Sequence, residues 1–522
     1  MLPVLPAWGV MVGLVAGLSV GRVSAAENAT GRPNFLVIVA DDLGFSDLGC
    51  YGGEIDTPEL DRLAAGGLRF TQFYNTARCW PSRAALLTGY YAQQVRRDSV
   101  PGIVSGGRGR RPAWAKLLTE YLKPLGYRSY HSGKWHIDGT PLQNGFDRSY
   151  RVDDQDRYFA PRLHWEDDIK LPQPKMDSGY YATVAIANHA VKCLRDHAEH
   201  HAGKPFFVYL CFTCPHFPLQ ALPEDIQKYR GKYRAGWDAL RRQRHERQQA
   251  LGLVRCSLSP RTDGVPAWEM LSETERDEWE VRMAVHAAMV DRMDREIGRV
   301  LQQVKTMGAW DDTLVLFLSD NGASAERIVR GDGHDPQAPP GSARWYRCLE
   351  PGWANLANAP LRYSKIYVHE GGISTPLIVH WPKGIRGRGE LRHNPCHLID
   401  VPPTLMALAG GQWPPANLAP AAPPPPGKNL VPVFDRDNSV RHDVLWWYHS
   451  GNRAIRMGDW KLVSVGEKGP WELYDLANDR SETTNLAERH PDKVRELAQV
   501  WQKHLEEFRR HATADGKAIP TP

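Results

Sequence analysis

Four short apolar runs that each end in polar residues constrain the fold of this chain more than any other feature. They are NFLVIVADDLG (34–44), PFFVYLCFTCPH (205–216), TLVLFLSDNG (313–322) and TPLIVHWP (375–382). Strands that are apolar without alternation are buried on both faces, as in the parallel sheets of α/β proteins. The sequence therefore predicts an α/β fold with a large, mostly parallel β-sheet.

Helical patterns fill the segments between these runs. Residues 272–308 open with a capping box formed by Ser272 and Glu275, and apolar residues recur at helical spacing as far as Gly308. Alternation of strands and helices predicts that helices sandwich the sheet. We assign residues 31–412 to this main domain, which would carry any catalytic site.

A second, smaller unit follows a proline-rich stretch. Residues 413–429 are too rich in proline for a core element and predict a surface connection. The segments VLWWYH, AIRMGDWKLVSV and PWELYDL then read as short strands, and a closing helix places Leu497, Trp501 and Leu505 on one face. Residues 430–515 are therefore expected to form an α+β subdomain with an antiparallel sheet and a packed helix.

The N-terminus resembles an export signal. Residues 2–20 hold no charged side chain, and Val23-Ser24-Ala25 has the small-residue spacing of a cleavage site. A membrane anchor is the alternative, but prolines and glycines break the short apolar run. We expect residues 1–25 to be a signal peptide, the mature protein to be periplasmic or secreted, and no stable membrane span to remain.

The charge and the cysteines exclude other classes. A net charge of +5 spread over 522 residues does not predict a nucleic-acid partner, and the arginine-rich stretch 228–255 reads as a solvated helix face. Eight cysteines are too few for a disulfide scaffold. Cys211 and Cys214 form a CxxC pair, but Pro215 and Pro218 prevent the helix that a redox pair would open, so we expect a plain or disulfide-bonded turn.

Polar residues at the carboxyl ends of the strands form a candidate ligand set. In open α/β sheets, ligands bind beyond these ends. The residues expected there are Asp41, Asp42, His216, Asp320 and Asn321. Carboxylate and amide oxygens suit a hard cation such as Ca²⁺ or Mg²⁺.

Cys79 lies in the stretch YNTARCWPSRAALLTGYY. Pro81 suits the first turn of a helix and Gly89 suits its end, so Cys79 is expected at the N-terminus of a short helix with Arg83 one turn inside. That position attracts anions and lowers the pKa of a thiol, so a nucleophilic thiolate is one interpretation. A thiolate is, however, a poor partner for a hard cation, and an oxygen nucleophile would suit the site better.

The segment CWPSRAALLTG resembles the C-x-P-S-R-x-x-L-x-T-G signature of the formylglycine-dependent (type I) sulfatases of the alkaline phosphatase superfamily. The resemblance runs from NFLVIVADDLG to WELYDLANDRSETTNLA. It implies that Cys79 is oxidised to formylglycine by a formylglycine-generating or anaerobic sulfatase-maturating enzyme. It also implies that Asp41, Asp42, Asp320, Asn321 and modified Cys79 hold one Ca²⁺, with Mg²⁺ the less favoured ion.

The same resemblance implies a role for each remaining residue. Arg83 would hold the aldehyde hydrate, which attacks a sulfate ester of an aryl alcohol or a carbohydrate. Lys134 and Lys365 would stabilise the sulfuryl oxygens, and His216 would assist the departing alcohol. His136 would remove a proton from the second hydroxyl of the hydrate, so that sulfate leaves and the aldehyde returns.

Several alternatives stay open. A phosphomonoester or phosphonate ester hydrolase of the same superfamily, or a non-catalytic sulfoglycan-binding protein, would keep much of this pattern. In the loop 326–360, Trp345, Tyr346 and Trp353 either stack on a substrate ring or pack the loop. His369 either lies in the pocket or is structural.

Overall fold

The computed structural model describes Met1 and residues 31–100, 103–176 and 178–515. Apart from Met1, the predicted signal peptide lies outside these described residues. No helix among them is long and apolar enough to cross a bilayer.

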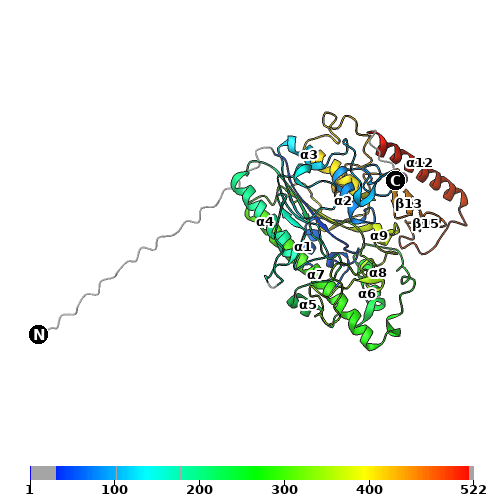
Figure 1. Cartoon of the computed structure of the whole chain (residues 1–522). Helices are drawn as coiled ribbons and strands as arrows, with labels where there is room; N and C mark the ends of the chain where they lie inside the picture. Colours follow the sequence, from blue (N-terminus) through cyan, green and yellow to red (C-terminus); the bar gives the residue numbers. More distant parts are fainter. Residues whose placement is uncertain (2–30, 101–102, 177, 516–522) are drawn as a thin grey trace.

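The described residues form one large sheet and one small sheet (Figure 1). Ten strands of the large sheet follow the order β10-β2-β9-β8-β1-β7-β3-β4-β5-β6, and β11 pairs with β2. The strands are β1 (Asn34–Ala40), β2 (Leu68–Tyr74), β3 (Arg128–Lys134), β4 (Arg148–Val152), β5 (His164–Glu166), β6 (Ile169–Lys170), β7 (Phe206–Cys211), β8 (Thr313–Ser319), β9 (Ser374–His380), β10 (Glu390–Arg392) and β11 (Cys396–His397). The four apolar runs thus form β1, β7, β8 and β9, as predicted.

The centre of the large sheet is parallel. Strand β1 pairs in parallel with β7 and β8, and β3 pairs in parallel with β7 and β4. Strand β9 differs, because it runs antiparallel to both β8 and β2. Its first residues therefore lie at the edge where the parallel strands end, which brings the segment before β9 to that edge.

Helices cover both faces of the large sheet (Figure 1). Along β1, Leu36 and Ile38 pack in a core with α4 and α7, whereas Phe35 and Val37 pack in a second core with α2, α3 and α10. The helices are α1 (Pro58–Ala65), α2 (Cys79–Thr88), α3 (Leu118–Leu122), α4 (Ala182–His200), α5 (Pro223–Tyr229), α6 (Gly236–Ala250), α7 (Glu273–Thr306), α8 (Glu350–Ala357), α9 (Glu370–Ile373), α10 (Val401–Leu408), α11 (Val431–Asp435) and α12 (Pro491–Thr513). Burial of alternate side chains on opposite faces explains why these strands are apolar throughout.

The small sheet is an antiparallel meander in the order β12-β13-β14-β15. Its strands are β12 (Leu445–His449), β13 (Asn452–Met457), β14 (Trp460–Ser464) and β15 (Glu472–Asp475). The segment AIRMGDWKLVSV supplies two of them, joined at Gly458, whose φ of 60° suits a tight turn. Helix α12 covers one face through Leu497, Trp501 and Leu505, and the other face packs against β2 through Tyr74.

The arginine-rich segment 228–255 differs from the prediction of a solvated face. In α6, Arg241 and Arg244 are buried. Arg244 forms ion pairs with Asp47 at 2.9 Å and with Glu54 at 2.7 Å. Buried arginines need such partners, and these lie nearly 200 positions away, where a local pattern cannot reveal them.

Candidate active site

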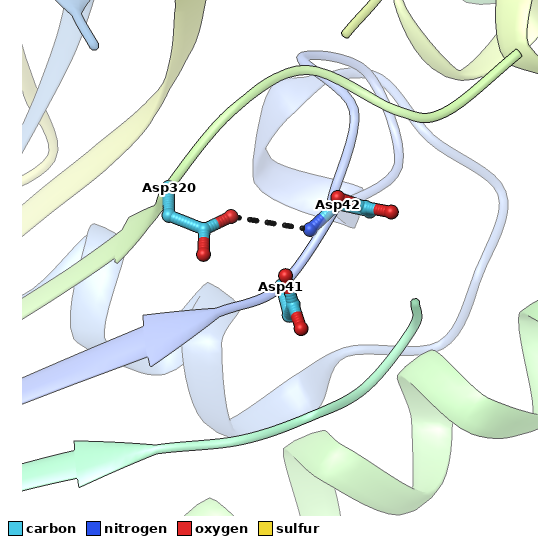
Figure 2. A group of neighbouring side chains, drawn as sticks. All are labelled: Asp41, Asp42 and Asp320. Carbon is cyan, nitrogen blue, oxygen red and sulfur yellow. Dashed lines mark hydrogen bonds between the residues drawn. The ribbon is translucent and has the colours of Figure 1, made fainter. Parts of the chain in front are cut away.

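Three buried carboxylates meet where β1 and β8 end. Asp41 and Asp42 follow β1, and Asp320 follows β8 (Figure 2). One oxygen from each carboxylate lies within 4.8 Å of the others. The Asp42 backbone N–H also donates to Asp320 Oδ1 at 3.4 Å. The strand ends therefore assemble the acidic cluster that the sequence predicted.

Two oxygens of this cluster have no hydrogen-bond partner within the described part of the chain. The Asn321 amide nitrogen donates to Asp42 Oδ1 at 2.7 Å and to the Gly322 carbonyl at 3.0 Å. The side-chain oxygen Oδ1 of Asn321 and Oδ1 of Asp41 are buried without a donor. Because an unsatisfied buried oxygen is costly, this donor set fits a hard divalent cation.

Three basic residues surround the carboxylates. Lys134 Nζ lies 2.5 Å from Asp41 Oδ2, Lys365 Nζ lies 2.8 Å from Asp42 Oδ2, and Arg83 Nη2 lies 2.8 Å from Asp320 Oδ2. Burial raises the pKa of Asp41 and of Asp320. Burial opposes the ionisation of Asp42 too, but the Lys365 ammonium lowers its pKa overall. Added positive charge at the open oxygens would stabilise all three ionised carboxylates.

Cys79 is the first residue of α2, as predicted, and Gly89 ends this helix with a φ of 69°. The Cys79 side chain is buried and lies close enough to interact with Asp320 and with Lys365. Arg83, one turn further on, donates to Asp320 and to the Lys134 carbonyl at 3.0 Å. The α2 N-terminus therefore places residue 79 beside the acidic cluster, and Arg83 fixes two of its neighbours.

Lys134 and His136 reach the site from the end of β3. Gly133, with a φ of 113°, precedes them, and a Cβ there would lie 1.8 Å from the Cys211 carbonyl oxygen, so only glycine fits. His136 has a φ of 61°, and its buried Nδ1 has no partner among the described residues. Burial and the nearby Lys134 hold the pKa of His136 well below its usual range. The imidazole is therefore neutral at pH 7.

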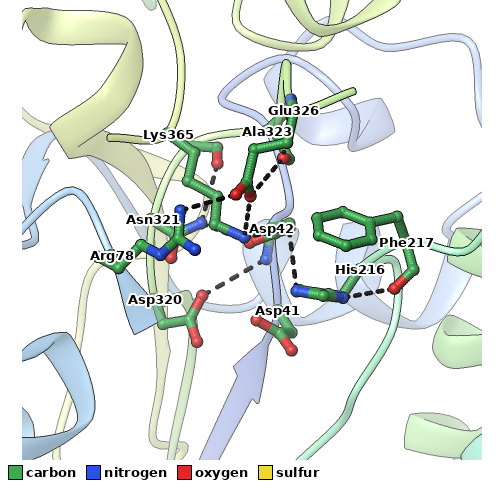
Figure 3. Close-up of polar contacts among 12 residues, drawn as sticks. Asp41, Asp42, Arg78, His216, Phe217, Asp320, Asn321, Ala323, Glu326 and Lys365 are labelled. Atoms are coloured by element: carbon green, nitrogen blue, oxygen red, sulfur yellow. Dashed lines mark hydrogen bonds and ion pairs between the residues drawn. The ribbon is translucent and has the colours of Figure 1, made fainter. Parts of the chain in front are cut away.

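His216 faces the cluster from the loop after β7. Its Nε2 lies 3.8 Å from Asp42 Oδ2, and its Nδ1 lies 2.5 Å from the Phe217 carbonyl oxygen (Figure 3). Burial and Lys365 hold the pKa of His216 well below its usual range. In the neutral ring, Nδ1–H donates to Phe217 and Nε2 carries the free lone pair.

Glu326 and Arg78 complete the site, and the sequence reasoning missed both. Glu326 lies 3.0 Å from Arg78 Nη1 and 3.0 Å from Lys365 Nζ (Figure 3). Arg78 directly precedes Cys79, and Glu326 follows Asn321 by five positions. Closeness in the sequence to a predicted site residue was the available signal for each of them, because neither belongs to a periodic pattern.

The small sheet supports the segment that carries Lys365. Ile366 has a φ of 83°, which is an unusual conformation for a β-branched residue. Its N–H donates to the Ala77 carbonyl at 2.9 Å, and its carbonyl accepts from Asn452 of β13 at 3.0 Å. Strain of this kind persists where the surroundings hold it, commonly at functional sites.

The structure resolves the open alternatives for Trp345, Trp353, His369 and the CxxC turn. Trp345 and Trp353 pack in the core and Trp353 is fully buried, so neither is a stacking surface for a ligand. His369 is buried at the start of α9, with Nε2 3.4 Å from Glu472, so it is structural. The disulfide alternative for the CxxC turn is wrong, because Cys211 and Cys214 are free thiols.

Known proteins are similar to this chain over most of its length. The family model described as Sulfatase matches residues 33–411, and the one described as N-sulphoglucosamine sulphohydrolase, C-terminal, matches residues 361–511. An uncharacterized sulfatase of Schizosaccharomyces pombe is 35% identical over 527 aligned residues, which cover 90% of this chain and 93% of the relative.

An arylsulfatase of Klebsiella aerogenes is 31% identical, with coverage of 77% of this chain and 91% of the relative. The solved structure of Ps i-CgsB in complex with k-i-k-neocarrahexaose has the same fold, with a TM-score of 0.65 at 24% identity and coverage of 91% and 93%. The chain therefore belongs to the sulfatase family and is a sulfuric ester hydrolase.

Proposed function

We propose that this protein hydrolyses sulfate monoesters, of aryl alcohols or of carbohydrates, with formylglycine formed from Cys79 and one Ca²⁺ bound beside it. Asp41, Asp42, Asp320 and Asn321 would hold the ion together with residue 79. The observation that carries the proposal is that two buried oxygens of the acidic cluster, Asp41 Oδ1 and Asn321 Oδ1, have no hydrogen-bond partner in the described part of the chain. Mg²⁺ is the less favoured ion.

Charge balance supports an anionic substrate. Without an ion, the carboxylates of Asp41, Asp42, Asp320 and Glu326 face the basic groups of Arg78, Arg83, Lys134 and Lys365. A divalent cation would make the site net positive, and this charge would attract a singly negative sulfate ester. The α2 N-terminus adds to the same field.

Formylglycine and the Ca²⁺ ion would supply the chemistry that the other side chains lack. The hydrated aldehyde would supply an oxygen nucleophile with a second hydroxyl, and the cation would lower the pKa of that nucleophile. The chain's own residues orient and neutralise the substrate. Lys134 and Lys365, both buried cations, would bind the non-bridging oxygens of the sulfate.

The two histidines would move protons at stated atoms. Neutral His136 can accept a proton from a hydroxyl of residue 79. His216 keeps Nδ1 bound to the Phe217 carbonyl, so any proton shared with the departing alcohol oxygen is carried at Nε2. An anionic ester next to His216 would raise the pKa of this imidazole and favour that proton.

Export and maturation belong to the same proposal. The uncharged segment 2–20 and the small residues at 23–25 support secretion or transfer to the periplasm. The signature at 79–89 supports recognition by a formylglycine-generating or anaerobic sulfatase-maturating enzyme.

Peptide mass spectrometry of the active protein tests the proposal. Residue 79 should be lighter than cysteine by the difference between a thiol and an aldehyde, and the modified fraction should scale with aryl sulfatase activity. Full activity with intact cysteine at position 79 would contradict it. Faster turnover of an aryl phosphate than of the matching aryl sulfate would favour the phosphoester or phosphonate alternative, and binding of sulfated glycan without sulfate release would favour the non-catalytic one.

A further inference from the structure

A cavity lies near the active site, and Arg330 of its wall reaches over the ring of Phe217. The cavity has a volume of about 620 Å³ and is bounded by residues 156–176, by Gln220 and by the loop 330–346. The Phe217 ring stacks on His216 with centroids 4.1 Å apart. Lys365 Nζ and the Arg330 guanidinium each lie 5.2 Å from the centroid of the same ring. The same phenyl ring therefore contacts Arg330 of the cavity wall as well as His216 and Lys365 of the proposed sulfate site.

Two polar groups on the cavity wall lack partners among the described residues. Tyr346 is only 5% exposed, and its buried hydroxyl makes no hydrogen bond there. His334 accepts the Tyr346 backbone N–H at Nδ1, at 3.1 Å, so in the neutral ring Nε2 carries the proton. That Nε2 is also buried without a partner. Such groups favour a ligand rich in hydroxyl groups.

The cavity wall carries four arginines and three aspartates, so its charge is slightly positive. Arg157 and Arg162 share Asp332 at 2.8 and 3.2 Å, and Arg344 pairs with Asp335 at 2.6 Å. Arg330 makes no ion pair within the described residues, although it lies over Phe217. One guanidinium thus stays available near the sulfate position, where a bidentate acidic group would suit it.

The cavity extends into a longer groove. A more open hollow of about 610 Å³ shares Arg162 and Gln173 with it and continues to Lys170. The first cavity has the size of a small-molecule site, which is about 300–1,000 Å³. A simple aryl sulfate would leave this groove empty, whereas a glycan chain would fill it.

We infer that this cavity binds the part of an anionic glycan next to the scissile sulfate, with Arg330 binding a second acidic group and Tyr346 a sugar hydroxyl. The inference rests on the proposed sulfatase activity and narrows its substrate class to carbohydrates with more than one acidic group. Arg330 and Tyr346 are then specificity residues, since neither contacts the acidic cluster.

The kinetic test compares two substrates for each variant. The probes are uronate-containing sulfated disaccharides from chondroitin sulfate and heparin, and 4-nitrophenyl sulfate. For Arg330→Ala and Tyr346→Phe, the ratio of kcat/KM for the preferred disaccharide to that for 4-nitrophenyl sulfate should fall about tenfold. Arg327→Ala is the matched control, because Arg327 is an exposed arginine of the same loop that pairs with Glu350 outside the cavity. An unchanged ratio in both test variants would overturn the inference.

Binding to a catalytically inactive chain separates this inference from the proposed function. In Cys79→Ala protein, calorimetric titration should show that Arg330→Ala and Tyr346→Phe each raise the Kd of the disaccharide about tenfold. If both substitutions raise the Kd in this way but the unsubstituted protein hydrolyses no sulfate ester, the inference would be supported and the proposed function contradicted. Turnover of 4-nitrophenyl sulfate without binding of any disaccharide probe would leave the proposed function intact and overturn the inference.

Discussion

Two of the buried clusters of charged residues in the described part of the chain differ in one respect. The acidic cluster of the active site leaves Asp41 Oδ1 and Asn321 Oδ1 without a partner among the described residues. The second group, here called the inter-sheet cluster, joins the large sheet to the small one. It consists of Tyr74, Glu370, Arg456, Lys461, Arg480 and Glu482.

Every carboxylate oxygen of the inter-sheet cluster faces a cation, a hydroxyl or an N–H group, although the contact of Glu482 Oε1 with Lys461 is an ion pair without hydrogen-bond geometry. Lys461 Nζ lies 2.9 Å from Glu370 Oε1 and 2.8 Å from Glu482 Oε1. Arg480 and Tyr74 bind Glu370 Oε2 at 3.2 and 2.9 Å, and the Glu370 N–H donates to Glu482 Oε2 at 2.8 Å. A closed network of this kind fixes geometry, whereas an open one has room for a ligand. The comparison therefore supports a structural role for the inter-sheet cluster and the catalytic role that we propose for the acidic cluster.

The largest expected effect is the loss of activity in Asp41→Asn. Removing this carboxylate weakens the cation site and leaves Lys134 without its partner, so kcat/KM for 4-nitrophenyl sulfate should fall at least about 10³-fold. Circular dichroism should show a folded protein. Retention of a tenth or more of the activity would contradict the assignment of this cluster to catalysis.

In the inter-sheet cluster, Lys461→Met should act on stability instead. It leaves Glu370 and Glu482 buried with fewer donors, so the free energy of unfolding should fall by about 3–5 kcal/mol in urea titrations. The folded fraction should keep its kcat. Lys468→Met, at an exposed position after β14, is the control and should change neither quantity. A large loss of kcat at unchanged stability would contradict a purely structural role for the inter-sheet cluster.

Calcium should stabilise the protein through the open cluster alone. A ligand that binds only the native state, at a hundred times its Kd, adds about 2.7 kcal/mol to the free energy of unfolding. EDTA should remove this increment in the unsubstituted protein, and Asp41→Asn should show a much smaller one. An equal response to calcium in both proteins would place the ion elsewhere.

Glu326→Gln should have the smallest effect. Glu326 contacts Arg78 and Lys365 rather than the acidic cluster, and loss of such a supporting group typically costs about tenfold or somewhat more. The decrease should appear in kcat/KM with little change in stability. Glu269→Gln, at an exposed position, serves as the matched control.

The central geometry of the site could be predicted from the sequence because it depends on strand ends. Asp41, Asp42, Asp320 and Asn321 follow buried parallel strands, and the carboxyl ends of such strands meet at one edge. Lys365 could be placed only through the family resemblance. It precedes β9, which is antiparallel to its neighbours, so its position at the same edge has no signature in the local pattern.

Other features depend on contacts between distant segments. Trp353 and Tyr346 lie close together in the sequence, yet Trp353, in α8, is fully buried in the core and Tyr346 lines a cavity. Arg244 pairs with Asp47 and Glu54, which come from a different part of the chain. Tertiary packing decides whether such residues are buried and which partners they have, and the composition of a short sequence segment does not predict either.

A crystal structure of the active protein grown with Ca²⁺ tests the central claim most directly. The account predicts one ion bound by Asp41 Oδ1 and Asn321 Oδ1, the two oxygens that lack donors, with an oxygen of modified residue 79 among its ligands. An active protein in which those oxygens bind only water, or in which the ion lies in another part of the molecule, would contradict it.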